Sequence, residues 1–222
     1  MLRNLTIKNK IVTLYQFCNI PKMTAPSGNP KHLELLHTAR QLFWKHGIRR
    51  VSVEEVCREA GVSKMTFYRA FPNKIELAKA MLQQAFDESM AEYRAIMAQD
   101  IPFEEKVQQQ LLLKFKGTKG ISAELVRDIY SNRDWGLREY MEQRTEEALK
   151  VIMDDFAQAQ QKGWIRKDMR LDFILFLFHR MQAWITDEHL LASYADTQEL
   201  VMEITNFFFY GIMPHASKNH EQ

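Results

Sequence analysis

The stretch that decides the fold is SVEEVCREAGVSKMTFYRAFPNK, residues 52–74. It predicts two short helices joined by a tight turn at Gly61. Ser52 begins an S-x-x-E capping box, which opens the first helix. Ser63 is placed to cap the second helix, which we expect to run to about Phe71. This spacing is typical of a helix-turn-helix, in which the second helix lies in the major groove of DNA.

Helical spacing divides the second helix into two faces. Val62, Phe67 and Phe71 fall on the side that turns inward to a small core. The outward side combines an ammonium, a guanidinium, a hydroxyl, a phenol and a flexible apolar chain, which favours a DNA surface over a merely solvated one. These outward residues are Lys64, Met65, Thr66, Tyr68 and Arg69.

The chemistry of these side chains predicts their roles. Lys64 can reach guanine O6 and N7 or a phosphate, while Thr66 and Met65 suit a base edge or a thymine methyl group. Hydroxyls, phenols, ammonium groups and the free amides at helix starts can anchor phosphates, which fixes the register on the duplex. The predicted DNA-binding set is Ser52, Ser63, Lys64, Met65, Thr66, Tyr68, Arg69 and Lys74.

Spacing alone leaves an alternative open, because helix-turn-helix shapes also occur in helical interaction proteins that bind no DNA. The charge distribution favours a polyanion at one end of the chain. Residues 1–30 hold four Lys/Arg and no acid, and residues 31–80 hold ten Lys/Arg against five Asp/Glu. Residues 81–222 hold 16 against 23, so the net charge of +2 hides a basic first third.

Composition predicts an all-α protein without a structural metal or a disulfide framework. The 222 residues include only 8 Gly and 6 Pro, and 46% are hydrophobic. Two cysteines, Cys18 and Cys57, indicate a reducing, cytoplasmic location. We expect Cys57 to be a buried structural thiol; a redox switch is the less favoured interpretation. No apolar run has the length of a membrane-spanning helix.

Residues 1–30 have the character of an N-terminal extension or flexible arm. The segment 11–17 is too short and too polar for a signal peptide, and Pro and Gly then mark a linker before residue 31. A basic arm that binds a membrane surface is an alternative function for residues 1–20.

Helical patterns continue to the end of the chain. Gly47 is expected as a left-handed C-cap of the first helix. Beyond residue 80 we expect long helices that include Met141–Lys162, Leu171–His189 and Thr197–Met213. The segment Leu171–His189 is apolar nearly all round, which predicts that it is buried.

Residues 31–80 resemble the DNA-binding domain of the TetR family of transcriptional regulators. The matching residues run from Leu42 and Phe43 through Ala60-Gly61-Val62-Ser63-Lys64 and Thr66-Phe67-Tyr68 to Phe71-Pro72-Asn73-Lys74. Three departures stand out: Met65 replaces a usually small residue, Arg69-Ala70 replaces a common aromatic–histidine pair, and Cys57 replaces an alanine.

The resemblance implies a helix-turn-helix DNA-binding domain over 31–80 and a ligand-binding and dimerisation domain over 81–222. It also implies a homodimer formed through Leu171–His189 and Thr197–Met213, bound to a palindromic double-stranded DNA operator. Most such proteins are repressors released by a small-molecule effector, and a transcriptional activator of the same fold is the alternative.

An apolar pocket in the second domain needs aromatic and methionine side chains with one polar group. The candidates, which any helical core would also need, are Tyr93, Met97, Phe115, Tyr130, Trp135, Met141, His179 and Trp184. We find no hydrolase, metalloprotease or phosphate-loop motif and no metal-ligand cluster. The sequence therefore predicts a regulator, not an enzyme, with no cofactor.

Overall fold

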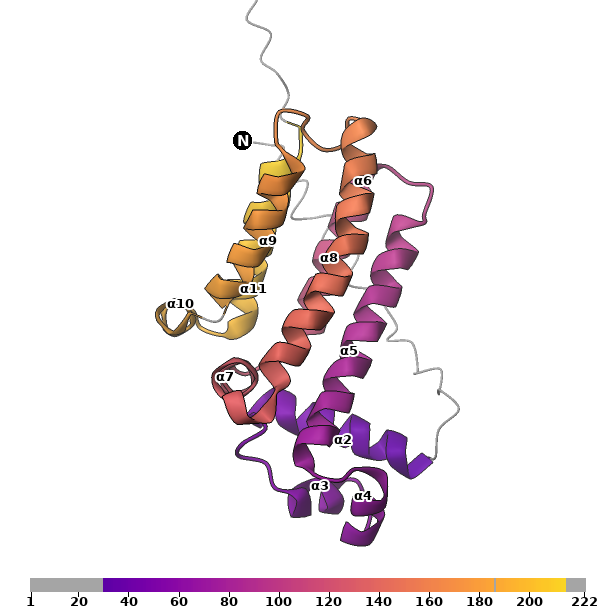
Figure 1. The fold of residues 1–222 in the computed structure, drawn as a ribbon, viewed down its shortest axis with the longest axis vertical. Helices are drawn as coiled ribbons and strands as arrows, with labels where there is room; N and C mark the ends of the chain where they lie inside the picture. The colour runs from indigo at the N-terminus through magenta and orange to yellow at the C-terminus, as the bar shows by residue number, and fades with distance from the viewer. Residues whose placement is uncertain (1–29, 186, 215–222) are drawn as a thin grey trace, which may run out of the picture. The chain divides into compact units, whose positions relative to one another are not determined.

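The computed structural model describes residues 30–185 and 187–214, the side chain of residue 182 excepted. All regular structure in these residues is helical, which confirms the predicted all-α class. The predicted extension lies outside the described residues, except for Pro30. The elements, shown in Figure 1, are α2 (Pro30–His46), α3 (Val53–Glu59), α4 (Lys64–Ala70), α5 (Lys74–Met97), α6 (Phe103–Thr118), α7 (Ala123–Ser131), a 3-10 turn η1 (Arg133–Trp135), α8 (Leu137–Gln161), α9 (Leu171–Ile185), α10 (Glu188–Ser193) and α11 (Thr197–Ile212).

The helices α2, α3 and α4 form a small head around the foot of α5 (Figure 1). Phe43, Val56, Phe67 and Leu77, one from each of these helices, are fully buried in its core. The same apolar cluster contains Leu125, Ile129 and Leu137, which come from α7 and from the start of α8. The head therefore does not close its core alone, and α7 completes it.

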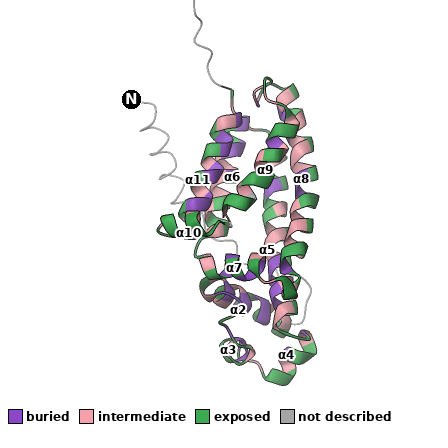
Figure 2. Cartoon of the chain, turned by 60° about the vertical axis from the view of Figure 1, so that its left-hand side comes forward, coloured by how far each residue is buried: buried purple, intermediate pink, exposed green. Residues whose placement is uncertain are grey.

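The remaining long helices form a ring. Each helix of the ring packs against two others: α6 against α5, α5 against α8, α8 against α9, and α9 against α11. The ring closes where α11 packs against α6. At one end of this ring a second buried cluster includes Phe103, Phe156, Ile174 and Phe208. In Figure 2, buried residues gather densely in the head and more sparsely along the ring helices.

Two expectations about the last helices need correction. The segment expected as one helix over Leu171–His189 ends at Ile185, and α10 begins at Glu188 after the N-cap Asp187, whose carboxylate accepts the amides of His189 and Leu190. The burial expected for this segment is also wrong for the single chain. On α9 only Ile174 is buried among the described side chains. Apolar character all round a helix does not distinguish burial in the chain's own core from a face left for another surface.

Candidate nucleic-acid interface

Caps and one glycine set the geometry of α3 and α4. The Ser52 hydroxyl accepts the amide of Glu55 at 3.1 Å, and the Ser63 hydroxyl accepts the amide of Thr66 at 3.1 Å. Between the helices Gly61 has φ +62°, a left-handed conformation that favours glycine. The two predicted caps are thus confirmed, and they fix where α4 begins.

The two faces of α4 are those that helical spacing predicts. Phe67 is completely buried and Phe71 nearly so, while Met65 is 71% exposed and Tyr68 is 55% exposed. Lys64 and Arg69 are exposed too, and Thr66 is half-buried. Large exposed apolar groups beside two cations are typical of a surface that binds a partner molecule.

The charged and hydroxyl groups of this face already have local partners. The Lys64 ammonium pairs with the Glu54 carboxylate of α3, which lowers the pKa of Glu54 and raises that of Lys64. The hydroxyls of Ser63 and Thr66 lie 3.0 Å apart and share a hydrogen bond. Lys64 must therefore leave Glu54 before it can bind a phosphate or a base.

Lys74 is placed differently from the expectation of a freely presented phosphate ligand. Its ammonium donates to the carbonyls of Val51 at 2.7 Å and of Arg49 at 3.3 Å. Burial lowers its pKa, partly offset by the nearby charge of Asp128. In this structure Lys74 holds the loop before α3. The amides at the start of α5 are capped by Asn73, whose side chain accepts from Ile75 and Glu76.

Sequence reasoning missed a joint between this loop and α7. The amide of Arg49 donates to Asp128 Oδ2 at 2.8 Å, and its guanidinium lies 3.7 Å from Asp128 Oδ1. Nearby, the amide of Ser122 donates to the carbonyl of Trp44 at 2.8 Å. Asp128 is buried, and its charge is balanced by this contact and by the nearby Lys74. The joint fixes the head on α7.

Cys57 is 5% exposed, and burial raises the pKa of its thiol, helped by Glu54. A thiol in this state is a poor nucleophile, which supports the structural interpretation. No group of three or more metal-ligating side chains occurs in the part of the chain that the structure describes. None of its helices combines the length and the apolar character that crossing a bilayer requires.

The eight pocket candidates do not converge on one place. Tyr130, Trp135 and Met141 pack against the head core, whereas Met97 packs against the other buried cluster. Burial raises the pKa of Tyr93, whose hydroxyl donates to Asp155 at 3.0 Å.

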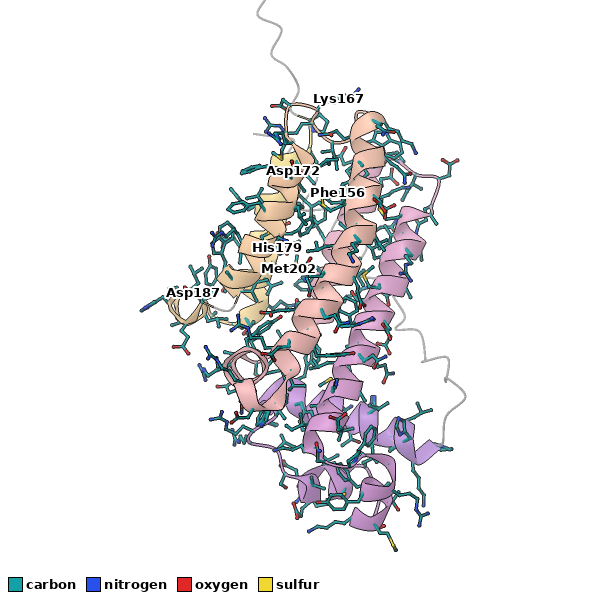
Figure 3. All side chains as sticks on the ribbon, in the orientation of Figure 1. Phe156, Lys167, Asp172, His179, Asp187 and Met202 are labelled. Carbon is teal, nitrogen blue, oxygen red and sulfur yellow. The ribbon has the colours of Figure 1, made fainter. Side chains whose placement is uncertain are left out.

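The other three candidates lie on α9 and α6. His179, labelled in Figure 3, lies 3.4 Å from the Glu146 carboxylate of α8. Trp184 is 37% exposed on α9, and the carbonyl of Phe115 on α6 accepts from Gln198. A pocket lined by the eight candidates together remains only a prediction.

Two capped short helices, a left-handed glycine between them and an exposed second helix define a helix-turn-helix DNA-binding protein. Residues 35–81 match the model of the family of bacterial regulatory proteins called the tetR family. Residues 35–81 therefore form a DNA-binding domain of the TetR family, and the chain is a DNA-binding transcriptional regulator.

Similar proteins support the same assignment. The transcriptional repressor KstR2 of Mycobacterium tuberculosis is 26% identical over 163 residues, which are 71% of this chain and 80% of the relative. The regulator EthR of the same species is 31% identical over 64 residues, or 29% of this chain and 30% of EthR.

Solved structures have the same fold. The fatty acid degradation regulator FadR of Bacillus halodurans covers 84% of this chain and 98% of its own, with a TM-score of 0.65 and 18% identity. The ketosteroid regulator KstR2 of Mycobacterium tuberculosis covers 87% of this chain and 100% of its own, with a TM-score of 0.55 and 20% identity.

Proposed function

We propose that the protein is a homodimeric repressor that binds a palindromic operator through two copies of α4 and leaves it when a small-molecule effector binds. In this proposal residues 31–80 form the DNA-binding domain and residues 81–222 the effector-binding and dimerisation domain. The proposal assigns no reaction to the chain.

One observation carries the proposal: where large hydrophobic side chains are exposed. Among the described residues, every such side chain lies on α4, α9 or α11, and the other helices expose none. Such concentrated apolar exposure marks interaction surfaces in soluble proteins. The residues are Met65 and Tyr68 on α4, Phe173, Phe176 and Trp184 on α9, and Phe207 and Tyr210 on α11.

The α9–α11 face supports a symmetric dimer. Phe173 and Phe176 stack with ring centroids 6.3 Å apart, and Trp184 follows on the same helical stripe. On α11, which packs against α9, Phe207 is 70% exposed. Aromatic residues on two packed helices, met by the same face of a second copy, form a four-helix interface of the kind that closed two-fold dimers use.

Two-fold symmetry sets what α4 can bind. Each copy presents its own α4, and two such helices fit successive major grooves when they stand about 34 Å apart. Lys64, Thr66 and Met65 then face base edges, and Tyr68 and Arg69 face phosphates. Ser52 and Ser63 lie at helix starts beside the DNA backbone, and Lys74 supports the loop before α3.

Repression is supported by KstR2, a transcriptional repressor whose match covers 71% of this chain. KstR2 is named for ketosteroids and FadR for fatty acid degradation, so two similar proteins are tied to apolar, lipid-like molecules. We propose an apolar effector of this general kind for the ring of helices. Activation instead of repression is the alternative within the same fold.

The test is binding to the DNA upstream of the protein's own gene, measured by gel shift at several salt concentrations. The wild type should bind one DNA per dimer and lose affinity steeply with salt, because phosphate contacts release counterions. Lys64→Ala and Tyr68→Ala should weaken DNA binding. The control Lys116→Ala, which removes an exposed lysine from α6, should leave DNA binding unchanged. Unchanged binding in both α4 variants would show that α4 does not read the DNA.

A further inference from the structure

An acidic residue of α3 lies against the helix that faces DNA in the proposed function. Glu54, in the first turn of α3, forms an ion pair with Lys64, the first residue of α4. Their side chains are 61% and 58% exposed, so the pair stands in solvent. The proposed function places Lys64 at a base edge or a phosphate, and a side chain in contact with Lys64 therefore belongs to the same surface.

The ion pair has little value as a stabilising contact. Exposed pairs contribute little to the free energy of folding, because water screens them and both side chains lose freedom. For binding DNA the pair is a disadvantage, since the carboxylate repels phosphates and holds the ammonium of Lys64 away from them. No such acid lies on α4 itself, and Glu59 of α3 pairs with Arg58 of its own helix at 3.1 Å. A role in the choice of DNA sequence accounts for Glu54 better than stability does.

A carboxylate in the major groove discriminates between bases. The hydrogen bond from Lys64 lowers the pKa of Glu54, so at neutral pH its side chain is ionised and only accepts hydrogen bonds. Cytosine N4 and adenine N6 are the amino groups that bases offer as donors in the major groove. The groove edges of guanine and thymine carry acceptor atoms instead, and these repel a carboxylate.

We propose that Glu54 is a specificity-determining residue of the DNA interface, whose carboxylate accepts a hydrogen bond from the amino group of a cytosine or an adenine. The inference deepens the proposed function and rests on it, because it requires that α4 faces base edges. It adds a residue of α3 that lies outside the eight residues predicted to bind DNA.

Glu54 and Lys64 act as one unit, because each is the partner of the other when no DNA is bound. At a base with an amino group, the carboxylate exchanges the ammonium for that donor, and Lys64 is released to a neighbouring guanine or phosphate. At a base without one, the carboxylate keeps Lys64, and the contact of Lys64 with DNA is lost. Glu54 thus weakens binding to mismatched DNA, which is one way in which a protein gains specificity.

Selection of bound sequences from random double-stranded DNA, run in parallel on the full-length wild type and its variants, tests this role. At one base pair of each half-site the wild type should prefer one base by about fivefold to a hundredfold. Glu54→Ala should lose this preference and keep those at the other positions. The control Glu59→Ala, which removes an acid that pairs within α3, should select the wild-type sequence.

A second measurement tests the hydrogen bond itself by deleting the amino group from the DNA. At the base pair identified by selection, purine replaces adenine or 2-pyrimidinone replaces cytosine, and gel shifts measure the affinity. The wild type should bind the altered operator about fivefold to a hundredfold more weakly, whereas Glu54→Ala should lose no more than about twofold. On DNA of unrelated sequence Glu54→Ala should bind about threefold or more tightly than the wild type, because it frees Lys64 and carries one negative charge fewer.

Three results would overturn the inference and leave α4 as the reading helix: an unchanged sequence preference in Glu54→Ala, equal losses by wild type and variant when the amino group is deleted, or weaker binding of Glu54→Ala to unrelated DNA. A wild type that selects no sequence from random DNA would overturn the proposed function as well. The two failures are therefore distinguishable. Unchanged circular dichroism spectra and melting temperatures establish that each variant is folded.

Discussion

Replacing Gly47 by alanine tests how tightly the head is joined to α7. Gly47 follows α2 with φ +77°, a conformation that favours glycine. A Cβ at this position would lie 2.8 Å from Asp128 Oδ2 and 2.9 Å from Glu124 Cβ, both on α7. Such contacts are too short to persist, so either α7 moves or the carboxylate leaves the amide of Arg49.

The magnitude has two parts, and a second glycine separates them. The left-handed backbone costs a non-glycine residue about 1–2 kcal/mol. Crowding against a packed helix adds about 1–3 kcal/mol. Gly163 also has φ +77°, but a Cβ there meets nothing within 4 Å. Gly163→Ala should therefore lose only the first part, whereas Gly47→Ala should lose both.

Urea unfolding followed by circular dichroism measures both variants against the wild type. We expect Gly47→Ala to reduce the free energy of unfolding by about 2–5 kcal/mol and Gly163→Ala by about 1–2 kcal/mol. Gel shifts should show weaker DNA binding only for Gly47→Ala, because only that change disturbs the loop before α3. Equal losses of stability in the two variants would refute the reasoning, since they would mean that α7 yields freely at the joint.

Three further outcomes follow from single side chains. Glu54→Gln should tighten DNA binding about threefold to tenfold in a gel shift, because it releases Lys64 and removes a negative charge near phosphates; weaker binding would contradict this. Thr66→Ala should reduce operator binding about tenfold and leave binding to unrelated DNA unchanged, as competition assays would show. Phe207→Glu should convert the dimer to a monomer in sedimentation equilibrium, with an unchanged circular dichroism spectrum, because it places a charge in an apolar interface. A dimer of undiminished stability would exclude the α9–α11 face.

The head could be predicted well because its signals are local. The caps Ser52 and Ser63 act on amides three residues ahead, and the Gly61 turn depends on one backbone angle. The inward and outward faces of α4 follow from helical periodicity, which needs no knowledge of the rest of the chain. Each of these features is fixed within a few residues of sequence.

The joint with α7 could not be predicted, because it depends on residues far apart in the chain. Arg49 and Asp128 are separated by 79 positions, and nothing near Gly47 indicates that another helix approaches it. The sequence predicted Gly47 as a left-handed C-cap, but it did not predict that α7 packs closely against this glycine. The same limit hid the carbonyl partners of Lys74.

The pocket candidates were selected by residue type, without knowledge of where each residue lies in the fold, and this explains why the effector site was predicted less well than the head. Aromatic and methionine residues are what a pocket and a core both need, so selection by type gathered Tyr130 and Trp135 from the head core.

The contacts around α7 indicate how binding of the proposed effector could alter the DNA-binding head. One face of α7 lies in the head core through Leu125 and Ile129. Its other side faces α10, where Arg127 lies 3.7 Å from Glu188. Since α10 packs against both α9 and α11, a ligand that spreads these helices also moves the far side of α7. The joint at Asp128 has no spare space, so it transmits such a shift to the loop before α3 instead of absorbing it. Two heads that must meet grooves at a fixed spacing tolerate little displacement, and a close-packed joint is therefore what release requires.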